Sequence, residues 1–198
     1  MLKKQAKVLS DPQVKAVLKY LESCPRNALR NQVMFLLSLH GLRAKEIAEL
    51  QVSMIVNSDG QINDVIALED KASKSTSGRL IPMNKLLRTR LSNYLGDRLN
   101  ALSDYVIQTE RSRKFSANAI VVLFKRLYFK LGFVGCSSHS GRRTFITNCA
   151  RRTSTVGGSL RDVMALVGHR HLGTTQRYID VNSEAQRALV DGLYSGIK

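Results

Sequence analysis

The most informative part of the sequence is the stretch Val167-Gly168-His169-Arg170-His171-Leu172-Gly173-Thr174-Thr175-Gln176-Arg177-Tyr178. It places Tyr178 nine residues after His169. The spacing of apolar residues predicts short helices over residues 160–167 and 174–179. Tyr178 would then lie near the end of a helix, where the simplest structural role of a tyrosine is to pack into the core.

Two further clusters precede this stretch. One is His139-Ser140-Gly141-Arg142-Arg143-Thr144 and the other is Gly41-Leu42-Arg43-Ala44-Lys45-Glu46. Each is a weak signal alone, because any helix start can carry Gly-Leu-Arg-x-x-Glu and His-x-x-Arg can be a solvated pair on one helix face. The order and spacing of all three clusters together carry the interpretation.

The residue types in these clusters suit chemistry on a phosphodiester. An enzyme must neutralise charge on the non-bridging oxygens, supply a nucleophile and protonate the leaving 5′ oxygen. The planar forks of Arg43 and Arg142 can pair bidentately with phosphate and stay charged. Tyrosine has a solution pKa of about 10, and flanking cations would favour the phenolate of Tyr178. His139 and His169 could orient the phosphate or carry the phenolic proton.

In this order the three clusters resemble the active site of the tyrosine recombinases, the phage-integrase family. The resemblance implies that Arg43 and Arg142 clamp the phosphate and that Tyr178 is the nucleophile. It also implies that His139 acts as a base near the nucleophile and that His169 hydrogen-bonds the phosphate. The likeness covers nearly the whole chain, from about residue 10 to residue 193.

The resembled family protonates the leaving oxygen with a lysine on a β-hairpin, and two lysines compete for this role. Lys74 lies eight residues before Pro82, and Arg79 lies three before it, which matches the family pattern of Lys, then Arg, two apolar residues and Pro. Lys71 lies three residues earlier and would need a longer hairpin, so we favour Lys74. Glu46 matches an acidic residue three positions after the first arginine, where it would support that arginine or its helix without transferring a proton.

The composition favours a nucleic-acid partner. Lysine and arginine number 31 against 15 acidic residues, a formal net charge of +16, and the basic residues are spread over the whole chain. This pattern suits a protein that wraps a duplex, although a generally basic soluble protein would also show it. The three cysteines do not suggest a disulfide framework, and the sequence shows neither a signal segment nor an apolar run of membrane-spanning length. We therefore expect a cytoplasmic protein with no membrane partner.

Other chemistries fit the sequence poorly. Cys136, His139, His169 and His171 could be assembled into a zinc set, but Cys136-x-x-His139 is one half-motif without a second cysteine pair. The chain has no Gly-x-Ser-x-Gly elbow and no nucleotide-binding loop of the Gly-x-x-x-x-Gly-Lys type. We therefore expect no metal and no cofactor. Rejoining needs no ATP, because a phosphotyrosine bond conserves the energy of the broken phosphodiester.

The predicted fold class is α+β, a mainly helical domain with a small antiparallel sheet. Ser10-Asp11-Pro12 predicts a helix start, with apolar residues then at helical spacing up to residue 21. Strands are predicted over residues 65–68 and 79–82, joined by a polar, lysine-bearing loop. Further helices are predicted over residues 26–39, 45–50, 85–99, 116–131, 142–151 and 183–194.

The chain is interpreted as one tyrosine-recombinase catalytic domain over residues 1–198, without the helical DNA-clamping domain that precedes it in many family members. It would be either a naturally short recombinase or a fragment of a longer integrase. Gly141 departs from the family pattern, because many members have leucine there. The helix over 183–194 could dock on its own core or, as in resembled recombinases, on a neighbouring protomer, and the sequence leaves both open.

The expected function is site-specific recombination of double-stranded DNA through a 3′-phosphotyrosine. The resemblance implies a homo-tetramer on two duplexes and allows a monomer in the absence of DNA. A type IB topoisomerase-like relaxing enzyme shares the chemistry, and a catalytically idle DNA-binding regulator could share the fold. The presence of all the implied catalytic residues argues against the regulator. The target sequence and the outcome, whether integration, excision, inversion or resolution, stay open.

Overall fold

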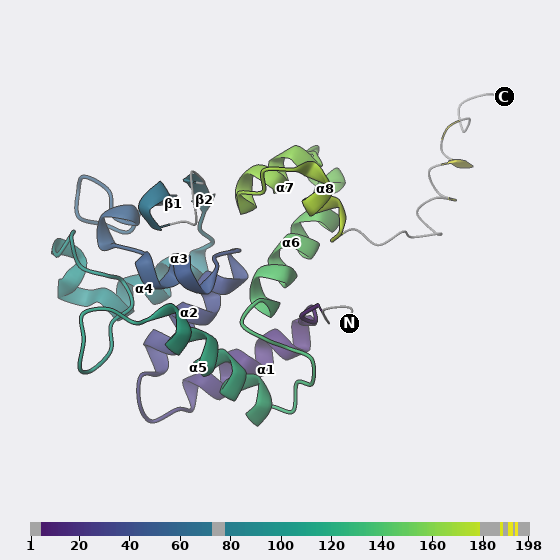
Figure 1. Ribbon diagram of the computed structural model, residues 1–198. Helices are drawn as coiled ribbons and strands as arrows, with labels where there is room; N and C mark the ends of the chain where they lie inside the picture. Colours follow the sequence, from purple (N-terminus) through teal and green to yellow (C-terminus); the bar gives the residue numbers. More distant parts are fainter. Residues whose placement is uncertain (1–4, 73–77, 179–186, 188–189, 192, 194–198) are drawn as a thin grey trace.

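The computed structural model describes residues 5–72 and 78–178, together with residues 187, 190, 191 and 193. It confirms the predicted mainly helical α+β architecture (Figure 1). The helices are α1 (Asp11–Glu22), α2 (Ala28–Leu39), α3 (Ala44–Glu49), α4 (Lys85–Leu95), α5 (Ala117–Lys130), α6 (Ser140–Arg152), α7 (Leu160–Val167) and α8 (Leu172–Gln176). Short 3-10 helices lie at Val52–Met54, Asp70–Ala72, Gly96–Asn100 and Ser154–Val156.

The two strands have the predicted bounds. Strand β1 (Val65–Leu68) pairs antiparallel with β2 (Arg79–Pro82), and Leu68 lies opposite Arg79. Ile66 on β1 and Ile81 on β2 are opposite each other and fully buried. The sheet therefore has an inner face that packs on the core, and its period of two places the side chain of Arg79 on the same face as Ile81.

Several helix ends differ from the predicted ones for local reasons. The second helix begins at Ala28 and not at residue 26, because Asn27 adopts a left-handed conformation with φ +58°. Helix α4 ends at Leu95 because Gly96 has φ +49°, and the chain continues as a 3-10 turn. Ser10 caps α1 as predicted, with its side chain accepting from the backbone N–H of Gln13. The predicted helix over 183–194 lies mostly outside the described residues.

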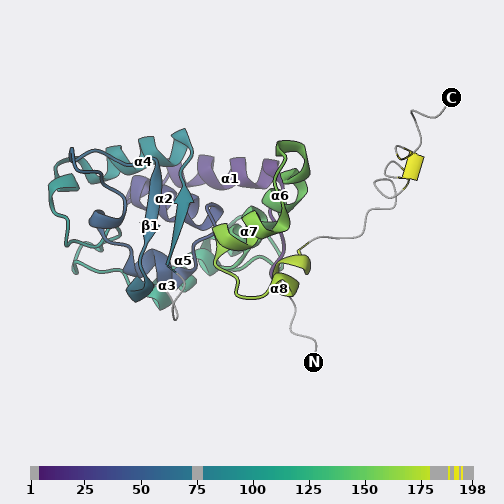
Figure 2. The ribbon, with the colours of Figure 1, turned by 90° about the horizontal axis from the view of Figure 1, so that it is seen from above.

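The molecule consists of a larger body and a smaller helical unit. Helices α1–α5 and the hairpin form the body, and α6, α7 and α8 lie together beside it (Figures 1 and 2). Helix α6 packs against α2, and α7 packs against β2. The N-terminal segment joins this boundary, because the backbone N–H of Leu9 donates to the hydroxyl of Thr144 at 2.8 Å.

Each unit has its own apolar cluster. The main cluster fills the body and includes the fully buried side chains of Phe35, Leu37 and Ile47. The second cluster is centred on three buried residues, Ile146, Val163 and Val167. The partly buried Phe145, Cys149 and Tyr178 pack against it. No helix among the described residues is long and apolar enough to cross a membrane.

Candidate active site

The first arginine of the site lies where α3 begins. Arg43 occupies the N-cap position, and its backbone N–H donates to Glu46 Oε2 at 2.8 Å. Its guanidinium Nη1 also donates to Glu46 Oε1 at 2.6 Å. Because Glu46 is in the first turn, the carboxylate satisfies a free N–H of the helix start and orients the arginine side chain. The side chain of Arg43 remains 34% exposed, so it can still meet a ligand.

Glu46 is a buried carboxylate shared by two arginines. Its side chain is only 1% exposed, and besides Arg43 it accepts from Arg79 Nη1 at 3.1 Å and Arg79 Nη2 at 3.0 Å. Burial alone would raise the pKa of Glu46, but the hydrogen bonds and charges of Arg79 and Arg43 outweigh it and hold that pKa below its usual range. Glu46 is therefore ionised at neutral pH.

Arg142 connects the two units of the molecule. It lies in the first turn of α6, is 5% exposed, and donates from Nη1 to the carbonyl of Gly41 and from Nη2 to the carbonyl of Val167 at 2.7 Å. Burial, and after it repulsion from Arg43, lowers the pKa of Arg142 to about 9, so the guanidinium remains charged at neutral pH. Arg43 and Arg142 are 99 positions apart in the sequence, and the hydrogen bond from Arg142 to Gly41 brings their two clusters together.

Gly141 explains how α6 approaches α2 so closely. A Cβ at this position would lie 2.1 Å from Ser38 Oγ and 2.9 Å from Ser38 Cβ. A leucine there would overlap α2, so this chain uses a glycine–serine contact to bring Arg142 to the carbonyl of Gly41. The glycine at position 141, where many family members have leucine, therefore affects how α6 packs on α2 and does not replace any candidate catalytic residue.

His169 follows the end of α7. Gly168 ends the helix in the left-handed conformation with φ +64°, which a glycine adopts without strain. The ring Nδ1 of His169 lies 3.0 Å from Thr175 Oγ1, and the ring stacks on that of Tyr178 with centroids 5.9 Å apart. Burial, followed by the charges of Arg142, Arg43 and Arg79, lowers the pKa of His169 to about 4. The imidazole is therefore neutral at physiological pH and has one N–H to donate.

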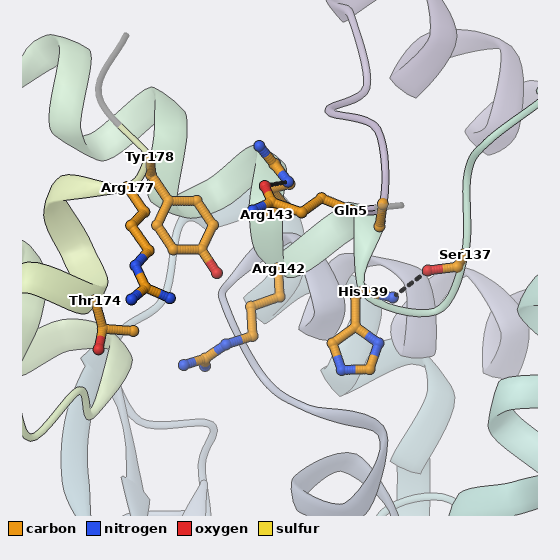
Figure 3. A pocket seen from close by; sticks show the side chains of 9 residues that line it. Gln5, Ser137, His139, Arg142, Arg143, Thr174, Arg177 and Tyr178 are labelled. Carbon is orange, nitrogen blue, oxygen red and sulfur yellow. Dashed lines mark hydrogen bonds between the residues drawn. The ribbon is translucent and has the colours of Figure 1, made fainter. Parts of the chain in front are cut away.

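Tyr178 lies just after α8, against the second apolar cluster. Besides His169, its ring contacts Arg143, whose guanidinium carbon is 5.6 Å from the ring centroid. Tyr178 and Arg142 both line a cavity of about 390 Å³, and the hydroxyl of Tyr178 points toward it (Figure 3). The remaining lining residues are Gln5, Ala6, Ser137, His139, Arg143, Thr174 and Arg177.

His139 lies on the other side of this cavity from Tyr178 (Figure 3). It is the N-cap residue of α6 and is exposed, with its backbone N–H donating to Ser137 Oγ at 3.3 Å. Its ring Nδ1 lies 3.4 Å from Ser138 Oγ. The cavity thus gathers the tyrosine, one arginine and the first histidine. Arg43 and His169 are not among its lining residues: His169 stacks on Tyr178, and Arg43 lies close enough to Arg142 to lower its pKa.

The lysine assignment is not tested, because Lys74 and the side chain of Lys71 lie outside the described residues. The hairpin that would carry either lysine is present, with Gly78 N–H donating to Asp70 Oδ1 at 2.6 Å where the described chain resumes. The described residues contain no group of three or more His, Cys, Asp or Glu side chains placed to hold a metal ion.

Sequence reasoning used Arg79 only to set the register of the hairpin and gave no role to Thr175, Arg143 or Arg177. The side chain of Arg79 is 5% exposed, whereas the neighbouring Leu80 is 64% exposed. The alternation of β2 was the available signal, because a buried Ile81 two positions later predicts an inward Arg79. Thr175 and Arg177 had no such signal, since their positions depend on how α8 is placed.

Comparison with known proteins places the chain in a family. A model of the phage integrase family matches residues 7–185. The chain belongs to the phage integrase family. Tyrosine recombinase XerA of Pyrococcus furiosus is 27% identical over 188 residues, which cover 93% of this chain and 61% of the relative. Tyrosine recombinase XerD of Ralstonia nicotianae is 28% identical over 190 residues, which cover 92% of this chain and 58% of the relative. The chain thus spans about three fifths of the length of these relatives.

Solved structures of this family share the fold. The crystal structure of XerA recombinase superposes with a TM-score of 0.71 at 24% identity, covering 94% of this chain and 65% of that one. The Tn1549 transposon integrase in complex with transposon right end DNA superposes with a TM-score of 0.78 at 17% identity, covering 98% of this chain and 68% of that one. At these identities the likeness establishes the fold.

Proposed function

We propose that this chain is the catalytic domain of a site-specific DNA recombinase. The oxygen of Tyr178 attacks a phosphodiester of duplex DNA, a bond forms between that oxygen and phosphorus, and the 5′ oxygen leaves with a proton. The products are a 3′-phosphotyrosine and a free 5′-hydroxyl. A 5′-hydroxyl of a partner strand then attacks the phosphotyrosine, so the strand is rejoined and the tyrosine is released without an external energy source.

The observation that carries this proposal is the meeting of Tyr178, Arg142 and His139 on one cavity. Around it, the guanidinium groups of Arg43, Arg79 and Arg142 gather near the carboxylate of Glu46. Positive charge therefore exceeds negative charge where the three clusters meet. A phosphate, and still more the transition state with its greater charge on the non-bridging oxygens, is stabilised by such a preorganised site.

The roles proposed for the individual residues are those that the family resemblance implies, and exposure and protonation support them. Arg43, which is partly exposed, and Arg142 bind the non-bridging oxygens, while the neutral His169 donates its ring N–H to the phosphate. His139, which is exposed and lines the same cavity as Tyr178, takes the phenolic proton of Tyr178. Lys74 on the hairpin protonates the leaving 5′ oxygen, in keeping with its register relative to Arg79 and Pro82.

The partner is double-stranded DNA, which the formal net charge of +16 favours. The XerA and XerD relatives are tyrosine recombinases, and the Tn1549 integrase was solved with transposon DNA. By extension we propose that four protomers assemble on two duplexes during strand exchange. We also propose a cytoplasmic location, where a chain with three free cysteines, Cys24, Cys136 and Cys149, would remain reduced.

Tyr178→Phe is the direct test of the nucleophile. The target site is first mapped by incubating the protein with sheared DNA of the source genome and sequencing the fragments that stay attached in detergent. On a nicked duplex of the mapped site, the parent should accumulate a covalent adduct. The phenylalanine variant should form none, yet bind the same duplex within about threefold, because the ring is retained and only the attacking oxygen is lost. An adduct in this variant would move the nucleophile elsewhere, with Tyr194 the next candidate. A parent chain that binds DNA and never forms an adduct would favour the DNA-binding regulator.

The leaving-group acid is tested with a substrate that needs no proton. Lys74→Ala should cleave an ordinary phosphodiester about 10²- to 10⁴-fold more slowly than the parent, which is the usual contribution of a general acid. A duplex with a 5′-bridging sulfur releases a thiolate that leaves without protonation, so this substrate should largely restore the rate. Lys71→Ala is the matched control on the same hairpin. Rescue of Lys71→Ala in place of Lys74→Ala would reverse the assignment.

A further inference from the structure

Arg79 is a buried arginine that does not line the cavity of Tyr178. It is the first residue of β2, and its side chain is 5% exposed. Its two terminal nitrogens donate to the two oxygens of Glu46 at 3.1 and 3.0 Å. Its third nitrogen, Nε, donates to the carbonyl of Leu166 at 2.9 Å. One planar fork thus binds α3 and the last turn of α7 at the same time.

Burying the charge of Arg79 costs free energy, and the need to fill space in the core does not by itself account for an arginine at this position. Moving a guanidinium out of water is expensive, and a buried ion pair is often no more stabilising than apolar side chains of similar volume. On the same strand the apolar Leu80 is 64% exposed, whereas the charged Arg79 is turned inward beside Ile81. The specific geometry of the fork is therefore the property to account for.

The two groups that Arg79 binds, the Glu46 carboxylate and the Leu166 carbonyl, are adjacent to two proposed phosphate ligands, Arg43 and His169. Glu46 holds the backbone and the guanidinium of Arg43. The Leu166 carbonyl precedes Gly168 and His169, and a Cβ on Gly168 would lie 3.1 Å from Arg79 Nη1. The guanidinium of Arg79 therefore rests against the turn from which His169 projects. Carbonyls at a helix C-terminus attract cations, which makes this contact favourable.

We propose that Arg79 is a positioning residue that fixes the separation of Arg43 from His169 and so orients the scissile phosphate. This inference rests on the proposed function. Arg79 acts through its neighbours, because its fork is directed at Glu46 and Leu166 and its side chain is almost fully buried. A lysine can supply the charge but not the fork, since it cannot span both oxygens of Glu46 and the Leu166 carbonyl in a fixed plane.

The first experiment compares single-turnover cleavage of the mapped, nicked duplex by Arg79→Lys and by the parent. We expect adduct formation to slow by about 10- to 100-fold, the scale expected when reacting groups are displaced by roughly 1 Å. DNA affinity should stay within about threefold, because most of it comes from distributed phosphate contacts. The control is Arg88→Lys, which makes the same change in the exposed pair of Arg88 with Asp64 and should leave the rate unchanged.

A double-mutant cycle separates positioning from a general loss of structure. Because Arg79 fixes Arg43 relative to His169, Arg79→Lys should slow cleavage less in an Arg43→Ala background than in the parent, since one of the two groups is gone. Urea titration of each variant gives the folded fraction by which the rates are corrected. Equal costs in the two backgrounds, or a cost fully accounted for by unfolded protein, would overturn the inference.

A second measurement does not depend on cleavage. Inorganic sulfate imitates the tetrahedral phosphate, and its binding can be followed by the chemical shifts of the His169 ring. Arg79→Lys should bind sulfate several-fold more weakly than the parent, whereas Arg88→Lys should not. If the parent binds sulfate but never forms a DNA adduct, the proposed function fails. The sulfate affinities of Arg79→Lys and Arg88→Lys then still decide whether Arg79 positions the anion ligands. If the parent forms adducts and Arg79→Lys matches it in both assays, the positioning role fails and the proposed function stands.

Discussion

Arg43 and Tyr178, both assigned to the proposed site, are held by very different amounts of packing. Arg43 begins α3, whose Ile47 and Ala48 are buried in the main apolar cluster of the body. Tyr178 follows α8 and rests on the second cluster, which has three buried residues. The proposed phosphate ligand thus lies on a large core and the proposed nucleophile on a small one.

Besides the small apolar cluster, hydrogen bonds from two arginines hold the smaller unit against the body. Arg142 binds carbonyls of Gly41 and Val167, and Arg79 binds Glu46 and the Leu166 carbonyl. The smaller unit is therefore fixed to the body by guanidinium groups that are themselves part of the site or touch it. Regions with few buried apolar contacts open at lower free energy than the core does. We expect the unit that carries Tyr178 to move more readily than the body that carries Arg43.

Removal of the Glu46 charge should have the largest effect on this arrangement. Glu46→Gln removes the negative charge that accepts from both terminal nitrogens of the buried Arg79 guanidinium and that offsets the charges of Arg43 and Arg142. Loss of one partner of a buried pair typically costs about 3 to 5 kcal/mol. Urea denaturation should show a loss of free energy of unfolding of about 3 kcal/mol, the lower end because Arg43 is partly exposed.

The double variant Glu46→Gln with Arg79→Met tests the cause of that loss. It removes the buried guanidinium of Arg79 as well as the carboxylate of Glu46, so it should be more stable than Glu46→Gln alone. A double variant that is less stable would show that Arg79 contributes mainly by packing.

A matched pair of core substitutions tests the difference between the two units. Val33 on α2 lies in the main cluster at 0% exposure, and Val163 on α7 lies in the second cluster at 1%. Val33→Ala should lower the global free energy of unfolding by about 2 kcal/mol, from lost methyl burial and the cavity left behind. Val163→Ala should instead mainly increase local opening of α6–α8.

Native-state hydrogen exchange distinguishes these outcomes. Val163→Ala should speed exchange at the amides of α7 much more than at those of α2, and it should slow adduct formation by Tyr178. Val33→Ala should speed exchange throughout. Equal changes across the whole molecule for both variants would mean that the two clusters unfold as one unit.

The sequence predicted much of the fold because its signals are local. Ser10 with Pro12 marked the start of α1, and the apolar runs of β1 and β2 had the observed bounds. Asn27 shortened α2 at its start through a left-handed conformation that composition does not reveal. Local sequence patterns thus predicted which helices and strands form, whereas left-handed backbone conformations shifted some helix ends from the predicted residues.

The candidate site was predictable only in part, because part of it depends on three-dimensional packing. The clusters that contain Arg43, Arg142 and Tyr178 could be recognised by residue type, order and spacing. The pairing of Arg79 with Glu46 joins positions 33 apart, and the contact of Gly141 with Ser38 depends on how α6 crosses α2. The stacking of His169 on Tyr178 depends on the placement of α8. No local pattern specifies such contacts, although strand alternation pointed to the inward side of Arg79.

The pH dependence of stability should show the smallest of these effects, and it reports on the boundary itself. Burial and the neighbouring Arg142, Arg43 and Arg79 lower the pKa of His169 from 6.5 to about 4. Between these values the unfolded chain binds a proton that the folded chain does not, so the stabilising contribution is fully present above pH 6.5 and is lost as the pH falls through 4. The parent should therefore lose melting temperature on acidification more steeply than His169→Gln, which keeps a polar side chain but cannot titrate. His40, whose pKa is also lowered by burial, and the carboxylates are present in both proteins, so they cancel in the comparison. Added sulfate should reduce the difference, because an anion beside the imidazole favours its protonated form. Identical slopes for the two proteins would mean that neither burial nor the three arginines lower the pKa of His169 in the free chain. The two units would then meet less closely than the contacts of Arg142 and Arg79 indicate.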